Sequence, residues 1–332
     1  MEKHIVLLFG GQGHEHEVSV EGKTALRRHF NCGKYRVTEI YIDKDGNFFI
    51  ENADGEKYPT FPVKIMGKSG FMKGSSFITP DAVFPLLHGD FGEDGRVQGL
   101  LECASLPFVG EGVGVGALTS DKAYTKAVAE RLGIPTARYI VLRGEISSED
   151  AEKRVSGELG YPVFVKPTGL GSSLGASKAY SRAEFLKAYK EASTLGDVIA
   201  EELVEDKREL EVAYLNYFGR PVLTPPSEIL CPDTYGYNEK YKLGTKTNLR
   251  AEVSLEISEL ARKFAYMLVR EIGIFSLSRI DFFLRRGELL FNEINTLPGF
   301  TDGSMYLKML KADGISEEAV IDALISRAGE RR

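Results

Sequence analysis

The stretch PVFVKPTGLGSSLG, residues 162–175, joins an apolar run to a lysine and then to a loop rich in glycine and serine. Residues 162–165 predict a buried β-strand, so Lys166 stands where the strand ends, and Pro167 prevents an ordinary continuation of the ladder. The glycines that follow permit positive φ angles and close approach to a ligand, while Ser172 and Ser173 offer hydroxyls and amides. This combination suits the binding of phosphate.

The order of residues in this stretch differs from the common phosphate-binding loop G-x-x-x-x-G-K-[ST], because here the lysine precedes the glycines. Taken alone, the segment also fits a plain glycine-rich surface loop after an edge strand. If it binds phosphate, it therefore belongs to a different nucleotide-binding fold.

Length and composition indicate a globular protein with small-molecule partners. A chain of 332 residues with 43% hydrophobic content predicts two or three domains. No run of about 18 apolar residues is present, and the start MEKHIVLLFGG shows no signal-peptide pattern, so we expect a cytoplasmic protein without membrane contact. Cys32, Cys103 and Cys231 are too far apart for a zinc motif or a disulfide framework. A net charge of −6 without a basic cluster argues against nucleic acid.

The first 120 residues alternate strand-like and helical runs, which is the pattern of a parallel α/β sheet. Polar clusters at 10–17 and 88–95 follow two of these strands, and sites in such sheets form at the carboxyl ends of strands. A second unit begins near residue 121, with a capping box at Ser181 and Glu184. A third follows an irregular stretch, 225–253, whose length is typical of a lid. A helical stripe then runs from Ile257 to Gly273.

Residues 279–300 read as a hairpin with its turn around Arg286 and Gly287. The period of two places Glu293 and Asn295 on one face, with Asp281 opposite or beside Glu293 on the partner strand. Two carboxylates and an amide suit a hard cation such as Mg²⁺. The alternative is a solvated polar face on an amphipathic hairpin.

A nucleotide edge is predicted at Glu201-Glu202-Leu203 and Glu209. The backbone there would meet adenine, and Glu209 would meet the ribose hydroxyls. Acidic residues in strands are also common as simple edge charges, which is the alternative for this segment.

Six segments together resemble the D-alanine–D-alanine ligases, a family of ATP-grasp ligases. They are GGxxxExEVS at 10–19, LHGxxGEDGxxQGxLE at 87–102, DK at 121–122, VKPxxxGSSxG at 165–175, EKY at 239–241 and RIDFF…NEINTLPGFT…S at 279–304. The resemblance implies an α/β protein, α+β in its ATP-binding part, with the ATP-grasp fold. Its units would be a Rossmann-like parallel-sheet domain at 1–120, a central subdomain at 121–215, and a C-terminal subdomain at 216–332 with a lid at 231–250.

The resemblance also implies the ligands and their residues. The ATP contacts would be Lys122 and Lys166 at the phosphates, Ser172 and Ser173 in the covering flap, Glu201, Leu203 and Glu209 at adenosine, and Lys240 in the lid. Two Mg²⁺ ions, replaceable by Mn²⁺, would be bound by Asp281, Glu293 and Asn295. A homodimer is implied as well.

For the amino acids, the resemblance implies two neighbouring sites. Glu15 would bind the ammonium of the first D-alanine with His88 nearby, and Ser304 would bind the carboxylate of the second. Arg279 and the amide of Gly299 would stabilise the oxyanion, and Glu15, Ser172 and Tyr241 would form a hydrogen-bonded triad across the closed site. The implied reaction makes D-alanyl-D-alanine for peptidoglycan precursors through an acyl phosphate.

Four features depart from the family pattern, and none of them removes a catalytic group; those in and after the lid bear on acceptor specificity. They are Leu307, Gly236, Val109 and the segment TNLRAEVS after the lid. The lid is where relatives that make D-Ala-D-Ser or D-Ala-D-lactate differ, and Lys240-Tyr241 favours an amino-acid acceptor. A catalytically silent nucleotide- or dipeptide-binding relative is a further alternative. A Rossmann dehydrogenase is disfavoured because GGQGHE lacks the G-x-G-x-x-G spacing.

Overall fold

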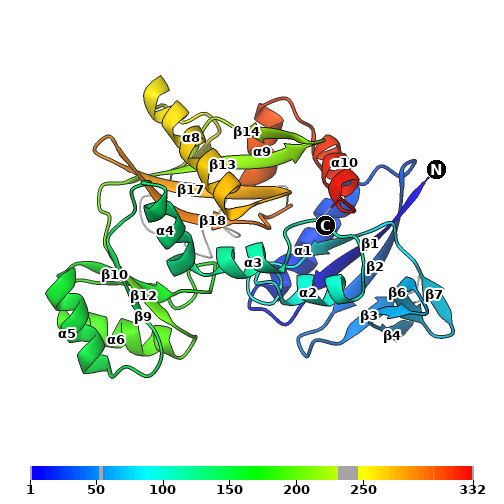
Figure 1. Cartoon of the computed structure of the whole chain (residues 1–332), viewed down its shortest axis with the longest axis horizontal. Coiled ribbons are helices and arrows are strands. Elements are labelled where there is room, and N and C mark those ends of the chain that lie inside the picture. The colour runs from blue at the N-terminus through cyan, green and yellow to red at the C-terminus, as the bar shows by residue number, and fades with distance from the viewer. Residues whose placement is uncertain (1, 52–54, 231–245, 302, 331–332) are drawn as a thin grey trace.

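The computed structural model describes residues 2–51, 55–230, 246–301 and 303–330, and within these ranges the chain forms four β-sheets (Figure 1). The N-terminal part is built on a short parallel sheet. β1 (Lys3–Gly10) pairs in parallel with β2 (Tyr35–Ile42) and with β8 (Ala82–Leu86). Ile5 to Leu8 are fully buried, as expected for a parallel strand covered on both faces. The predicted parallel arrangement is thus confirmed for these three strands.

Antiparallel strands between β2 and β8, which the sequence pattern did not indicate, enlarge this part of the molecule. β3 (Phe48–Glu51) and β4 (Lys57–Thr60) extend the sheet in the order β4-β3-β2-β1-β8. A separate sheet contains β5 (Pro62–Ile65), β6 (Lys68–Lys73) and β7 (Ser76–Ile78). The helices α1 (His16–Arg28) and α2 (Arg96–Cys103) follow the carboxyl ends of β1 and β8, so the two predicted polar clusters lie beside each other.

A four-stranded antiparallel sheet forms the middle of the chain, in the order β11-β10-β12-β9. Its strands are β9 (Tyr139–Leu142), β10 (Val163–Pro167), β11 (Ser177–Ala179) and β12 (Val198–Glu202). The helices of this region are α3 (Val113–Ser120), α4 (Lys122–Arg131), α5 (Ser148–Glu158) and α6 (Arg182–Ser193). The predicted capping by Ser181 is confirmed, because its hydroxyl oxygen accepts a hydrogen bond from the Glu184 amide. The return bond differs from a regular capping box, since Glu184 accepts from the amide of Tyr180 and not from that of Ser181.

β10 is buried as predicted, but it continues one residue further than predicted, because its ladder with β12 runs to the pair Pro167↔Val198. It pairs on both sides, so the alternative of an edge strand is wrong. Pairing with β11 ends earlier, at Val165↔Ser177. Proline therefore lies at the last strand position, where the missing amide costs no ladder bond on the β11 side.

A six-stranded antiparallel sheet forms the C-terminal part, in the order β16-β15-β13-β17-β18 with β14 on β13. Its strands are β13 (Arg208–Tyr217), β14 (Arg220–Leu223), β15 (Ser227–Leu230), β16 (Lys246–Asn248), β17 (Leu277–Arg285) and β18 (Glu288–Asn295). The helices are α8 (Leu255–Ile272), α9 (Met305–Ala312) and α10 (Glu317–Arg327). The stretch 225–253 is thus partly regular, since it contains β15 and β16. The predicted division at residue 215 falls inside β13.

Two predicted features that require positive φ angles are confirmed, the end of a helix and the turn of a hairpin. α8 ends at Gly273, whose φ of 80° gives the left-handed C-cap. The β17–β18 hairpin turns at Arg286 and Gly287, with φ values of 51° and 86°. Two consecutive positive φ angles match the right-handed twist of the strands on either side. The turn pairs Arg285 with Glu288, and a register shift between Asp281 and Phe282 then brings Asp281 opposite Glu293.

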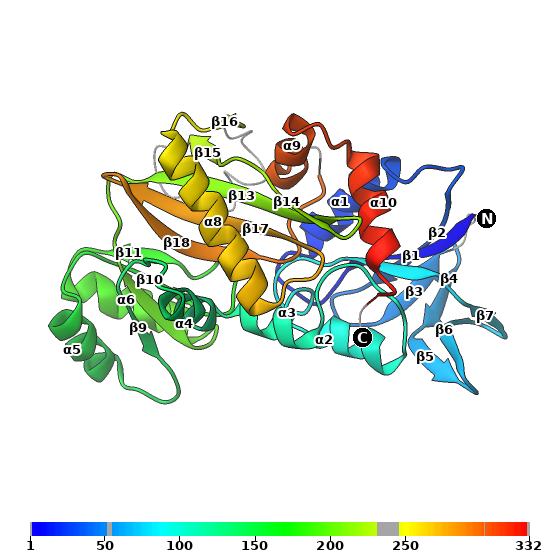
Figure 2. The ribbon, with the colours of Figure 1, turned by 45° about the horizontal axis from the view of Figure 1, so that its top comes forward.

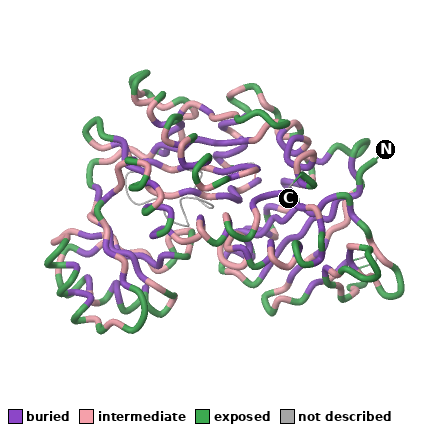
Figure 3. Tube along the Cα trace, in the orientation of Figure 1, coloured by how far each residue is buried: buried purple, intermediate pink, exposed green. Residues whose placement is uncertain are grey.

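The buried cores show how the parts are joined. One core is shared by the N-terminal sheet, β13, β17, α9 and α10, where Phe84 contacts Phe300 with ring centroids 5.4 Å apart. A second core joins α4 and α8 to the six-stranded sheet. The four-stranded sheet has its own core with α5 and α6, and in Figures 1 and 2 it stands apart from the rest. A further core lies between the N-terminal sheet and α2, and Figure 3 shows buried segments in all of these parts. No helix in the described part of the chain is both long and apolar enough to span a membrane.

Candidate active site

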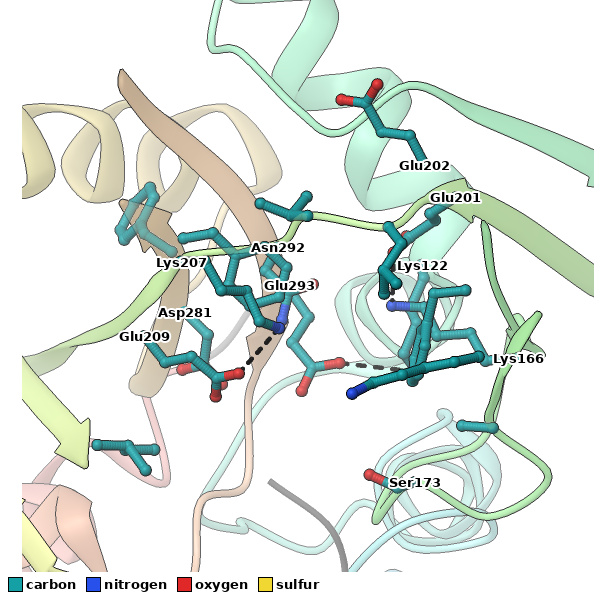
Figure 4. A pocket seen from close by; sticks show the side chains of 18 of the residues that line it. Lys122, Lys166, Ser173, Glu201, Glu202, Lys207, Glu209, Asp281, Asn292 and Glu293 are labelled. Carbon is teal, nitrogen blue, oxygen red and sulfur yellow. Dashed lines mark ion pairs between the residues drawn. The ribbon is translucent and has the colours of Figure 1, made fainter. Parts of the chain in front are cut away.

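A cavity of about 380 Å³ lies between the four-stranded and six-stranded sheets. This volume is in the range of small-molecule sites. The predicted ATP and metal residues that line it are Lys122, Lys166, Ser172, Ser173, Glu201, Leu203, Glu209, Asp281 and Glu293. Figure 4 shows Lys122, Lys166 and Glu293 directed toward the same space from α4, β10 and β18. Lys122 and Glu293 are 171 positions apart in the sequence, and the fold brings both to this cavity.

Lys122 is held at the beginning of α4. The side chain of Asp121 caps this helix by accepting hydrogen bonds from the amides of Ala123 and Tyr124, which fixes the position of the first turn. The Lys122 ammonium donates to the carbonyl of Leu170 at 2.7 Å and lies 3.8 Å from a carboxylate oxygen of Glu293. It thus connects the flap to the hairpin.

Lys166 is held at the end of β10 by a buried carboxylate. Its ammonium lies 3.0 Å from one oxygen of Glu201, and the other oxygen of Glu201 lies 3.1 Å from the ammonium of Lys126. Burial by itself raises the pKa of Glu201, but the two lysines outweigh it and lower that pKa to about 2. Glu201 is therefore ionised, and its side chain is engaged with lysines.

The flap between β10 and β11 is not a plain surface loop, because residues 170–174 line the cavity. Ser172 and Ser173 have positive φ angles of 51° and 57°, and Gly175 has one of 67°. Such angles are uncommon outside glycine and fold the flap tightly. The hydroxyl of Ser172 donates a hydrogen bond to the carboxylate of Glu15, which belongs to the N-terminal part.

The hairpin face predicted to bind metal also borders the cavity. Asp281 pairs with Glu293, and Arg279 pairs with Asn295, so all four share one face of β17 and β18. The guanidinium of Arg279 binds Asp281 through two hydrogen bonds of 2.8 and 2.7 Å and lies 3.1 Å from Glu211. Burial lowers the pKa of Arg279, but these two carboxylates raise it well above its usual value. A partly buried charged network of this kind is more than the simple solvated face that the hairpin pattern also allowed.

The donor chemistry of this face suits magnesium. Asp281 and Glu293 offer carboxylate oxygens to the cavity, and oxygen ligands are those that Mg²⁺ prefers. Asn295 lies two positions beyond Glu293 and is not among the described residues that line the cavity; its side-chain oxygen accepts from the Leu297 amide at 2.9 Å. Among the described residues, no three His, Cys, Asp or Glu side chains gather closely enough to hold a metal by themselves. An ion here would need further oxygens, such as those of phosphates.

Glu15 and His88 lie at the adjacent carboxyl ends of β1 and β8, and both are buried. A Cβ built on Gly89 would lie 2.3 Å from a carboxylate oxygen of Glu15, so glycine is required for this close approach. The Nδ1 of His88 lies 3.3 Å from the Leu297 carbonyl oxygen, and its buried Nε2 has no hydrogen-bond partner among the described residues. Burial lowers the pKa of His88, against the influence of Glu15. The cluster offers a carboxylate beside a neutral imidazole.

Gly299 and Ser304 are neighbours in the turn before α9. A Cβ on Gly299 would come within 2.7 Å of the Ser304 hydroxyl. Ser304 occupies the N-cap position of α9, but its side chain makes no capping hydrogen bond. Its hydroxyl oxygen instead accepts from the Thr301 amide at 2.9 Å. The side chain of Ser304 therefore does not cap α9.

The predicted adenosine residues lie along β12 and β13. The amide of Leu203 donates to the Pro162 carbonyl at 3.1 Å. The carboxylate of Glu209 lies 2.9 Å from the ammonium of Lys207, which in turn lies 3.7 Å from the centre of the Phe283 ring. The two predicted lid residues, Lys240 and Tyr241, lie outside the described residues.

Several residues of this region were not predicted from the sequence. These residues interact with the charged side chains of the site or line the cavity: Lys126, Glu211, Glu93, Lys207 and Asn292. Lys126 had a sequence signal, because it stands four positions after Lys122 and therefore on the same face of a helix. Asn292 had none, since it enters the cavity lining through a register shift after Asp281.

A cavity that gathers lysines and carboxylates between two antiparallel sheets, covered by a glycine-serine flap, defines an ATP-grasp ligase. Two family profiles match the chain: one described as the D-Ala D-Ala ligase N-terminus over residues 4–111, and one described as the D-Ala D-Ala ligase C-terminus over residues 128–326. The chain belongs to the D-alanine–D-alanine ligase family.

Curated relatives and solved structures agree with this membership. The D-alanine–D-alanine ligase of Deinococcus radiodurans is 38% identical over 340 residues and covers 100% of both chains. That of Ruminiclostridium cellulolyticum is 36% identical, over 99% of this chain and 96% of the relative. The solved D-alanine–D-alanine ligase from Coxiella burnetii has a TM-score of 0.88 at 30% identity, over 99% and 94% of the two chains. The solved VanG D-Ala:D-Ser ligase from Enterococcus faecalis also has a TM-score of 0.88 at 30% identity, over 99% and 100%.

Proposed function

We propose that this protein joins two molecules of D-alanine into D-alanyl-D-alanine, with conversion of ATP to ADP and phosphate, as a step toward peptidoglycan. Family membership supports the reaction. One observation carries its assignment to this cavity: Lys122, Lys166 and Glu293 converge there from three elements, beneath a flap joined to Glu15. The presence of Arg279, Glu293 and Asn295 argues against a catalytically silent relative, which would not need a group to stabilise an oxyanion.

In the first step, a carboxylate oxygen of the first D-alanine attacks the γ-phosphorus of ATP. The bond to the β,γ-bridging oxygen breaks, ADP leaves, and an acyl phosphate forms. Lys122 and Lys166 neutralise charge on the phosphates, and the amides and hydroxyls of Ser172 and Ser173 cover them. We assign adenosine to Glu209 and to the backbone from Glu201 to Leu203, since the side chain of Glu201 is paired with Lys126 and Lys166.

Asp281, Glu293 and Asn295 would hold two Mg²⁺ ions, or Mn²⁺ in their place. The ions supply charge neutralisation at the phosphates. The orientation of Asp281 and Glu293 toward the cavity supports this assignment. The present hydrogen bonds of Asp281 to Arg279, and of Asn295 to the Leu297 amide, are the contacts that metal binding would have to share or replace.

In the second step, the amine of the second D-alanine attacks the acyl carbon, phosphate leaves, and the excess proton of the ammonium is released. Arg279 and the Gly299 amide stabilise the tetrahedral oxyanion. Ser304 binds the carboxylate of the second D-alanine, while Glu15 binds the ammonium of the first with His88 beside it. Exclusion of water protects the acyl phosphate, and we assign this to the flap together with Lys240 and Tyr241 of the lid.

A second candidate acceptor is D-serine. The likeness to the VanG D-Ala:D-Ser ligase is as high, by TM-score and identity, as that to the Coxiella ligase. The greater identity to curated D-alanine–D-alanine ligases, at 36–38%, favours D-alanine. By family resemblance we further propose a homodimer with three units, predicted at 1–120, 121–215 and 216–332. Because residue 215 lies inside β13, we place the second boundary before Arg208. Light scattering and limited proteolysis would test the two proposals.

The test is ADP release with D-alanine as donor and with D-alanine, D-serine or D-lactate offered as acceptor. We expect the highest kcat/KM for D-alanine as acceptor. A second test uses ATP with labelled oxygen and a donor whose amine cannot act as acceptor. Reversible phosphorylation of the donor should then move the label between the β,γ-bridging and non-bridging positions of ATP. Turnover with both substrates but no such movement would contradict a reversible phosphorylation step.

A further inference from the structure

The most completely buried cation near the cavity is one that the proposed mechanism does not use. The side chain of Lys126 is 0% exposed, and its ammonium lies 3.1 Å from Glu201. Burying an ammonium is costly unless a partner offsets the lost hydration. A lysine in such a place therefore calls for a physical reason beyond filling space, which leucine or methionine would do more cheaply.

The geometry gives that reason. Lys126 stands one helical turn after Lys122 on α4, so the helix directs one lysine to the cavity and the other to Glu201. Glu201 then receives Lys126 on one oxygen and Lys166 on the other, at 3.1 and 3.0 Å. Lys166 lines the cavity, whereas Lys126 does not contact it.

The charges of this triad decide what the cavity presents to a phosphate. Glu201 holds the Lys166 ammonium in place. If Glu201 were paired with Lys166 alone, however, its negative charge would cancel the positive charge of Lys166. Burial lowers the pKa of Lys126, and Glu201 at 3.1 Å acts in the opposite direction and raises it. With both lysines protonated, two cations and one anion leave one net positive charge. At short range and away from bulk water, such a charge acts strongly on an anion.

We propose that Lys126 is a positioning residue for nucleotide phosphate binding, which keeps the Lys126–Glu201–Lys166 triad at a net charge of +1 while Glu201 fixes the Lys166 ammonium. The inference rests on the proposed function, because it takes Lys166 as a phosphate contact. It assigns Lys126 no contact with substrate. Its effect should therefore scale with the charge of the nucleotide and be small for adenosine.

Three full-length variants test this by charge count: Lys126→Met (net 0), Glu201→Gln (net +2), and the double variant (net +1). Calorimetric titration with ATP and with adenosine, both with Mg²⁺, measures the affinity of each variant for the two ligands. The quantity compared is the ratio of ATP affinity to adenosine affinity. We expect Lys126→Met to lower ATP affinity by roughly 10- to 100-fold and to change adenosine affinity by less than about twofold. The double variant should regain most of the wild-type ratio, and Glu201→Gln should have a ratio at least as high as the double variant.

Other outcomes overturn the inference. Equal loss of ATP and adenosine affinity in Lys126→Met would mark a purely structural role, and so would a double variant no better than the single one. If thermal melts show that Lys126→Met does not fold, the comparison of Glu201→Gln with the double variant decides. A lower ratio in Glu201→Gln would refute the role of net charge. A ratio at least as high as that of the double variant would support it. Absence of ATP binding by the wild-type protein would refute the proposed function itself.

Discussion

Ser172 of the flap donates a hydrogen bond to the carboxylate of Glu15, 157 residues earlier in the chain. This contact joins the proposed phosphate cover to the proposed site of the first amino acid. Glu15 is buried, and its carboxylate also lies close to Gly89 and Gly171. The carboxylate is thus enclosed by backbone from both the N-terminal sheet and the flap. A ligand ammonium at Glu15 and a closed flap over ATP would stabilise each other through this contact.

We predict that Ser172→Ala loosens the flap in the ligand-free protein. A hydrogen bond to a charged group contributes about 1.5–3 kcal/mol, so the amides of residues 169–175 should exchange with solvent faster. Hydrogen exchange read by mass spectrometry measures this directly. Glu15→Gln, which keeps an acceptor but removes its charge, should give a smaller increase. Unchanged exchange in Ser172→Ala would mean that the turns at Ser172 and Gly175 hold the flap by themselves.

Glu15→Gln should also weaken binding of the first amino acid, because a charge-assisted contact with an ammonium is stronger than a neutral one. We expect the KM for the first D-alanine to rise by roughly tenfold or more, with ATP affinity nearly unchanged. Steady-state kinetics with the two D-alanine sites resolved, beside ATP titration, is the measurement. A loss of ATP affinity with an unchanged amino-acid KM would show that the N-terminal part has been given the wrong ligand.

Glu293→Gln should nearly abolish turnover while leaving the melting temperature close to that of wild type. The change is almost isosteric, but it removes a charge from the proposed metal site. Glu288→Gln is a matched control, since it lies at the far end of the same hairpin, with its side chain 56% exposed near Arg285. Normal activity of folded Glu293→Gln at ordinary Mg²⁺ would refute the metal assignment.

Ser304→Ala should raise the KM for the second D-alanine by about 10- to 100-fold and scarcely change that for the first. Some loss of stability is expected as well, because the Ser304 hydroxyl oxygen accepts from the Thr301 amide. Thr301→Val serves as control: it removes the hydroxyl that lies 2.9 Å from Ser304 but keeps Ser304 itself. Equal effects of both variants on the acceptor KM would point to the turn and not to a contact from Ser304.

A pH-dependent contribution to stability should come from Glu93. Burial and the nearby Glu15 raise the pKa of Glu93 from 4.5 to about 8, although the Gly89 amide lowers it. Folding therefore favours the protonated carboxyl. Its contribution is intact below the unfolded pKa and is lost as pH rises through about 8. Relative to wild type, Glu93→Gln should gain melting temperature between about pH 5 and pH 8.5. A difference between the two proteins that does not vary with pH would contradict this.

Local patterns in the sequence were sufficient to predict the elements that carry the site. Alternation of apolar and polar residues, with Gly287 in a turn that needs positive φ, predicted the β17–β18 hairpin and placed Asp281 opposite or beside Glu293. The register shift between Asp281 and Phe282 decides that the two lie opposite each other. Glycines, Ser172 and Ser173 after a lysine predicted the flap. These features depend on backbone sterics and on a period of two, both of which act over a few residues.

Tertiary structure alone decided how these elements share charge. The side chain of Glu201 lies between Lys126 and Lys166 because β12 pairs beside β10 while α4 packs near both, and no local pattern encodes that meeting. The link from Ser172 to Glu15 likewise depends on the placement of two separate sheets. The sequence by itself therefore determined which residues form strands, turns and the flap. Packing between sheets determined which charges are neutralised, because Coulomb interactions and burial depend on distance in space and not on separation along the chain.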